Sequence, residues 1–144
     1  MSGEYVRKDG ASGWVEVVTG LSLTAGTFVQ ASSNSFASML ATTEKDYPEF
    51  EIKINITSGT PTENNTIEVH LRMSDGTNTE PAPSGNFAPH NIGAVTLDNA
   101  TGWYFEDGLP ILNKNATIYL KSNEASTTLT ASVYIKAKTG APAA

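Results

Sequence analysis

The alternation of apolar and polar residues is clearest in the middle of the chain. Phe50–Thr57 has an apolar residue at every second position, and after a polar interval Ile67–Met73 alternates in the same way. A period of two residues is typical of strands that bury one face and leave the other to water or a partner. The interval Ser58–Thr66 contains Gly59 and Pro61, which favour turns. The pattern therefore predicts a long antiparallel hairpin.

The same two-residue period recurs on both sides of this stretch. It predicts further strands at Trp14–Val18, Leu21–Thr24, Thr27–Ala31, Ile92–Leu97, Trp103–Glu106, Ala116–Lys121 and Thr128–Lys138. The last two of these strands are joined by a short polar segment, so we expect them to form a second hairpin. In the final strand the apolar residues face inward, and Thr130, Ser132, Tyr134, Lys136 and Lys138 face outward.

One segment does not fit the strand pattern. Phe36, Met39 and Leu40 are spaced as neighbours on one helical turn, and Ser33, Asn34 or Ser35 could cap it. Residues 32–44 fit either a short helix or a loop that plugs one end of the core.

About eight short strands with frequent turns predict an all-β fold, an antiparallel β-sandwich that is jelly-roll-like. The length of 144 residues suits one domain. We expect a flexible polar N-terminal arm at residues 1–13, a single β-sandwich domain at residues 14–138 and a short C-terminal tail at residues 139–144. Thr77–His90 contains three prolines and is predicted to be a long loop, and Pro110 argues against a central strand position.

Composition narrows the classes of partner. The net charge is −6 with only 9 Lys and Arg residues, which argues against nucleic-acid binding because phosphate neutralisation needs clustered cations. The chain has no cysteine, which removes disulfides and thiolate metal sites. No stretch of the sequence is apolar enough for a membrane span, and the first residues do not resemble a signal peptide.

Candidate chemistry is sparse. His70 is expected on the solvated face of its strand, and His90 has no obvious partner nearby in the sequence. No nucleophile motif accompanies either histidine. Acid pairs suited to glycoside hydrolysis can be drawn from Glu49, Glu51, Glu106 and Asp107, but the sequence does not place them. We therefore expect a protein without enzymatic activity, with no catalytic residues, no metal and no cofactor.

The aromatic run Trp103–Phe105 has three interpretations. Trp103 and Phe105 fall on one face of the predicted strand and Tyr104 on the other. They suit a sandwich core, a platform for stacking sugar rings or a protein interface. Three further apolar residues lie outside the strands, in the arm and in the long loop. The candidate interface residues are Tyr5, Val6, Phe87, Trp103 and Tyr104.

Several segments together resemble the small β-sandwich structural proteins of tailed bacteriophages, most closely the capsid decoration (cement) proteins. They are the polar N-terminal arm, FVQASS at residues 28–33, YPEF at 47–50, TGWY at 101–104 and IYLKS at 118–122. The resemblance covers most of the chain. It implies a virion protein, made in the host cytoplasm, that binds the outside of the assembled capsid. The implied partner is the major capsid protein, and the implied state is a homo-oligomer, with a trimer favoured.

Two other functions remain open from the sequence. The first is a module associated with the tail or a fibre that binds host surface glycans through Trp103 and Tyr104. The second is a glycoside or ester hydrolase that uses Glu106 or Asp107.

Overall fold

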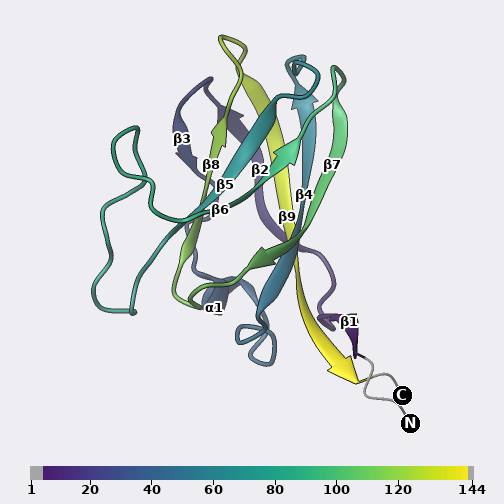
Figure 1. The fold of residues 1–144 in the computed structure, drawn as a ribbon, viewed down its shortest axis with the longest axis vertical. Helices are drawn as coiled ribbons and strands as arrows, with labels where there is room; N and C mark the ends of the chain where they lie inside the picture. Colours follow the sequence, from purple (N-terminus) through teal and green to yellow (C-terminus); the bar gives the residue numbers. More distant parts are fainter. Residues whose placement is uncertain (1–4, 143–144) are drawn as a thin grey trace.

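The chain folds into two layers of antiparallel strands (Figure 1). The computed structural model describes residues 5–142 of the chain, and the side chains of residues 9–139. The elements are β1 (Tyr5–Asp9), β2 (Val15–Leu23), β3 (Phe28–Gln30), α1 (Phe36–Met39), β4 (Glu49–Ser58), β5 (Thr66–Arg72), β6 (Asn91–Thr96), β7 (Gly102–Pro110), β8 (Thr117–Ser122) and β9 (Leu129–Pro142).

The strands divide between two sheets that are each four strands wide. In the first sheet, β9 pairs with β4, and β4 pairs with β7 at the edge. The other edge of β9 pairs with β2 along its first half and with β1 along its last five residues, so β1 and β2 share one position in the sheet. The second sheet has the order β3-β8-β5-β6.

The pairing follows a nested pattern. β2 pairs with β9, β3 with β8, β4 with β7 and β5 with β6. This is the arrangement that results when one long antiparallel ribbon folds over into two sheets, the jelly roll. The expected all-β, jelly-roll-like sandwich of about eight strands is therefore confirmed.

The two predicted hairpins are wrong. β4 pairs with β7 and β9, whereas β5 pairs with β6 and β8, so consecutive strands lie in opposite sheets. β8 and β9 are separated in the same way. The physical reason is that alternation reports only that one face of each strand is buried. A hairpin and an arch across the core satisfy this condition equally well.

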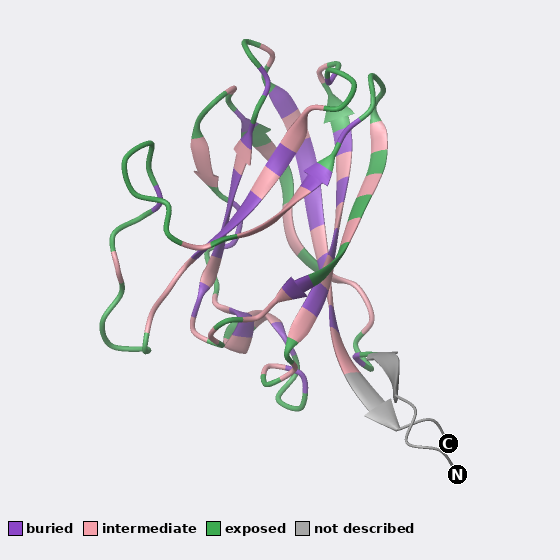
Figure 2. Ribbon diagram, viewed as in Figure 1, coloured by how far each residue is buried: buried purple, intermediate pink, exposed green. Residues whose placement is uncertain are grey.

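The core fills the space between the two sheets. On β4 the residues Phe50, Ile52, Ile54 and Ile56 are at most 1% exposed, and they face the equally buried Ile67, Val69 and Leu71 of β5. The alternation of buried and partly exposed residues along these strands is visible in Figure 2. Each such side chain contributes about 1.5–3 kcal/mol when it leaves water, so these strands account for much of the driving force for folding.

Both interpretations of residues 32–44 hold in part. α1 is a single turn capped by Ser35, whose side chain accepts a hydrogen bond from the Ser38 backbone N–H. Phe36 is fully buried, with its ring centroid 5.1 Å from that of Phe50. The short helix therefore also plugs one end of the core, at the lower end of the sandwich in Figure 1.

The termini differ from the expected arm and tail. Tyr5–Asp9 form β1, which pairs with Lys138–Pro142 at the end of β9. This paired ribbon continues past the end of the sandwich (Figure 1). Alternation was too weak in these polar segments to predict a strand, and their pairing joins the two ends of the chain.

A buried carboxylate ties together the two arches at the other end. Glu124, in the β8–β9 connection, is 4% exposed. It accepts hydrogen bonds from the Thr62 backbone N–H and hydroxyl and from the Asn65 amide, in the β4–β5 connection. Burial opposes ionisation of Glu124, but these hydrogen bonds outweigh it and hold the pKa below its usual value.

The long loop between β5 and β6 is organised by Glu80. Its carboxylate accepts a hydrogen bond from the Met73 backbone N–H at 2.7 Å and pairs with His90 Nε2 at 3.0 Å. His90 therefore has a partner that its place in the sequence did not reveal. Within residues 5–142, no helix is long and apolar enough to cross a membrane.

Candidate binding surface

The outer face of the first sheet brings together side chains from three adjacent strands. In the strand register, Lys53 of β4 lies opposite Phe105 of β7 and Tyr134 of β9, and Asn55 lies opposite Trp103. Because alternate residues of β4 are buried, Lys53 and its outward neighbours point away from the core. The register therefore gathers these side chains on one surface.

These residues form a cluster that we call the aromatic face, defined as Trp14, Lys53, Trp103, Phe105 and Tyr134. The ammonium of Lys53 lies 4.5 Å from the ring centroid of Trp14, 4.8 Å from that of Trp103 and 5.3 Å from that of Tyr134. Trp14 and Phe105 meet edge to face at 6.0 Å, and Trp103 and Tyr134 lie 5.8 Å apart. Both tryptophans of the chain belong to this cluster.

The aromatic face is open to solvent at β7. Trp103 is 47% exposed and Phe105 is 55% exposed, so the core interpretation of these two residues is wrong. The inward residue is Tyr104, which packs against the core and donates its hydroxyl hydrogen bond toward the Ala100 and Asp98 carbonyls. The alternation was predicted correctly, but the sequence did not tell which of the two faces is buried.

The position of Lys53 is held by the rings rather than by a carboxylate. Cation–π contacts contribute about 0.5–1 kcal/mol each at exposed sites and about 2 kcal/mol when they are shielded from water. Three rings around one ammonium therefore fix both the lysine and the rings. This leaves a preformed surface with little side-chain entropy to lose on binding.

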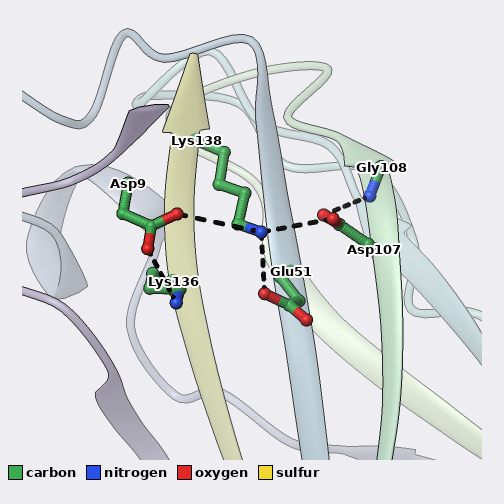
Figure 3. A network of polar contacts seen from close by, with 6 residues as sticks. All are labelled: Asp9, Glu51, Asp107, Gly108, Lys136 and Lys138. Atoms are coloured by element: carbon green, nitrogen blue, oxygen red, sulfur yellow. Dashed lines mark hydrogen bonds and ion pairs between the residues drawn. The ribbon is translucent and has the colours of Figure 1, made fainter. Parts of the chain in front are cut away.

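A polar network borders the aromatic face on the same sheet (Figure 3). The ammonium of Lys138 lies 2.9 Å from Glu51, 3.2 Å from Asp107 and 3.8 Å from Asp9. Lys136 binds Asp9 at 2.9 Å. Its ammonium also lies 4.6 Å from the Trp14 ring centroid, so the network and the aromatic face are contiguous.

The network shifts two ionisation equilibria. The hydrogen bond to Glu51, helped by Asp107, raises the pKa of Lys138 against the opposing effect of burial. The hydrogen bond from Lys136 lowers the pKa of Asp9. Glu51 and Asp107, considered as a hydrolytic acid pair, are joined here by the ammonium of Lys138.

The outer face of the second sheet is more closed, and one expectation about it is wrong. His70 is 2% exposed rather than solvated. Its Nε2 lies 2.8 Å from Glu68, and the Phe28 ring meets it edge-on at a centroid distance of 4.7 Å. His70 Nδ1 has no hydrogen-bond partner among the described residues. The neighbouring Tyr119, opposite His70 in the register, is 6% exposed.

Another candidate interface residue, Phe87, does not belong to the aromatic face. Phe87 is 37% exposed and lies in the long loop, where its backbone forms an isolated bridge with Ser84. Tyr5 and Val6 belong to β1, but their side chains lie outside the part that is described. Of the candidates whose side chains are described, Trp103 alone belongs to this cluster.

Other sites offer less. Across residues 5–142, no group of three or more His, Asp or Glu side chains is placed to hold a metal ion. A shallow pocket of about 440 Å³ is lined by residues that include Tyr47, Asp75 and Lys114. The Asp75 carboxylate is already occupied by the backbone N–H groups of Thr77 and Asn78.

Six members of this surface and its border were not candidates from the sequence: Asp9, Trp14, Lys53, Tyr134, Lys136 and Lys138. Three of them, Tyr134, Lys136 and Lys138, were predicted to face outward, but nothing in the sequence linked them to Trp103. The missing information was the register between β4, β7 and β9, which lie far apart in the chain.

Comparisons with protein-family models, curated proteins and solved structures found no match to this chain.

Proposed function

We propose that this protein is a non-enzymatic structural protein of a phage virion, and that it binds and stabilises the outer surface of the assembled capsid. Its partner is then the major capsid protein, and docking takes place through the aromatic face. The homotrimer implied by the resemblance to decoration proteins belongs to the same proposal. Jelly rolls occur in viral capsid proteins and in lectins, so the fold is compatible with this function without selecting it.

The observation that supports docking is the exposure of Trp103 and Phe105 beside a fixed lysine. Aromatic residues that leave water on binding are the commonest energetic centres of protein interfaces. A repeated shell multiplies such contacts, because many copies of one modest interface act on the same lattice. The bordering ion pairs supply the polar rim that interfaces of this kind have.

The location of the protein is tested on particles of the phage that carries the gene. The expected result is density for the chain on the outside of the head in an image reconstruction, with antibody labelling of the head. Density confined to the tail or its fibres would contradict capsid decoration. Particles that lack the chain altogether would contradict a virion role.

The docking surface is tested with shells that lack the protein. Trp103→Ala is expected to weaken binding to these shells by at least about 30-fold, as for the loss of a central interface aromatic. Phe87→Ala is the matched control, because Phe87 is also an exposed aromatic residue but lies in the long loop. Equal effects of the two substitutions would argue against the aromatic face.

A second candidate function is a tail or fibre module that binds host glycans. The observation that favours it is the exposed indole of Trp103, since sugar-binding proteins stack sugar rings on such side chains. Binding on a glycan array that disappears with Trp103→Ala, together with no binding to shells, would favour this function. The expected site then lacks Tyr104, which faces the core.

A further inference from the structure

Lys53 differs from the other lysines on its side of the molecule. Lys136 and Lys138 are each bound by at least one carboxylate within 3 Å. Lys53 lies at the centre of the aromatic face, and no carboxylate of the described residues is within ion-pair distance of it. Its contacts are the three rings, which accept no strong hydrogen bond from the ammonium.

An ammonium in this position has capacity for an anion. It carries three N–H donors, and the rings around it displace water that would otherwise hydrate it. In such a partly desolvated place, an anionic acceptor makes a shorter and stronger hydrogen bond than it makes in water. The face therefore combines apolar contact area with one unneutralised positive charge.

We propose that Lys53 is the site on this face that binds a carboxylate of the partner, an aspartate or glutamate side chain on the surface of the shell protein. Trp103 and Phe105 then contact apolar atoms around that acidic residue. This inference rests on the proposed function and specifies the chemistry of the partner. It adds a charge-complementary centre to a surface that would otherwise be recognised by apolar contact alone.

The extent of the face supports a protein partner over a single acidic sugar. Its residues come from β4, β7 and β9 and from Trp14, which directly precedes β2. These four strands are neighbours in the first sheet. Four strands at a spacing of about 4.8 Å give a surface roughly 15 Å wide. One sugar ring covers a fraction of that width, whereas a patch of protein surface covers all of it.

Cross-linking provides the direct test. A carbodiimide joins an amine to a carboxylate only when the two are in contact, so it is applied to the protein bound on shells. The expected product is an amide between Lys53 and an aspartate or glutamate of the shell protein, identified by mass spectrometry. Lys121 is the internal control, because its ammonium also lies over a ring, 5.4 Å from the Phe28 centroid, but on the other sheet.

Binding of variants to the same shells provides the second test. Lys53→Met keeps the length and apolar contacts of the side chain but removes its charge, and it is expected to weaken binding by at least about 10-fold. Lys53→Arg keeps the charge and is expected to stay within about threefold of the unmodified protein. Lys121→Met is expected to leave binding unchanged.

The outcomes separate the inference from the proposed function. Unmodified protein that fails to bind shells would overturn both. Binding that is lost with Trp103→Ala but is unchanged with Lys53→Met would leave docking intact and overturn the carboxylate contact. A cross-link from Lys53 to a carboxylate of a second copy of this chain would replace the shell partner by self-association and would also overturn the inference.

Discussion

The outer faces of the two sheets each carry a lysine over at least one aromatic ring, yet they differ in how far their aromatic residues are exposed. On the second sheet, His70 and Tyr119 are almost fully buried, and the acidic Glu68 is bonded to His70. On the first sheet, Trp103 and Phe105 are about half exposed. An aromatic residue on an outer sheet face therefore stabilises the fold where it is covered, and is open to contact with a partner where it is not.

The largest expected effect contrasts one aromatic residue from each face. Tyr119→Ala should lower the free energy of unfolding by about 3 kcal/mol, because it removes a buried ring and leaves a cavity. Trp103→Ala should cost about 1 kcal/mol or less, since nearly half of its side chain is already in water. Urea unfolding of the two variants measures both values. Equal losses would mean that the two faces do not differ as their exposure indicates.

The next effect concerns the contribution of Glu68, on the outer face of the second sheet, to stability at low pH. Burial opposes ionisation of Glu68, but its hydrogen bonds with His70 and Asn123, together with the nearby positive charge of Lys121, outweigh this and lower the pKa of Glu68. A lowered pKa stabilises the fold above the unfolded value of about 4.3, and this contribution disappears as the pH falls through the folded value. Glu68→Gln should therefore cost about 1–2 kcal/mol at pH 7.

The measurement is urea unfolding of Glu68→Gln and the unmodified protein between pH 7 and pH 3. The difference between them should shrink as the pH falls. A difference that is constant with pH would show that the lost interaction is packing rather than ionisation. Glu16→Gln serves as a control, because Glu16 is an exposed acid whose carboxylate bonds only the Thr19 hydroxyl, three residues away.

The sequence predicted the layers of this fold better than their connections. The alternation in β4, with Ile54 at its centre, identified a half-buried strand and its inward residues. It could not distinguish a hairpin from an arch, because Val69 of β5 is buried in either case. Strand pairing depends on contacts between segments far apart in the chain, and a two-residue period carries no information about them.

The same limit explains what was missed in the aromatic face. Trp103 was singled out because it lies in an aromatic run. Alternation does not tell which face of the strand is buried, and the interpretation that placed Trp103 in the core was wrong. The prediction for His70 was wrong in the opposite direction, because no feature of the sequence indicates that the polar side of β5 is covered. Lys53 had no signal of its own, because its role depends on rings contributed by three distant segments.

A smaller effect is expected for Lys138, on the outer face of the first sheet, whose contribution to stability is lost at high pH. The pKa of Lys138 is raised, chiefly by its hydrogen bond to Glu51. A raised pKa stabilises the fold below the unfolded value of about 10.4, and this contribution is lost as the pH rises through the folded value. Lys138→Met should cost about 1 kcal/mol at pH 7, because Glu51 and Asp107 then face each other without a cation.

Unfolding of Lys138→Met followed from pH 7 to pH 11 checks this expectation. The unmodified protein should approach the variant in stability only at the alkaline end of the range. Added salt should reduce the difference at pH 7, because ion pairs near the surface are screened. A difference that persists at pH 11 and in high salt would place the effect in the packing of the lysine stem instead.

The smallest effect on stability is expected for Phe105→Ser, on the most exposed ring of the aromatic face. With 55% of the residue in solvent, the substitution should change the free energy of unfolding by no more than about 0.5 kcal/mol. It should at the same time reduce any self-association of the protein in concentrated solution, because it removes apolar surface that water contacts unfavourably. Calorimetry and sedimentation measure the two quantities. A loss of stability similar to that of Tyr119→Ala would show that Phe105 supports the fold. The proposed difference between exposed and covered aromatic residues would then be contradicted at the residue where it is expected to be largest.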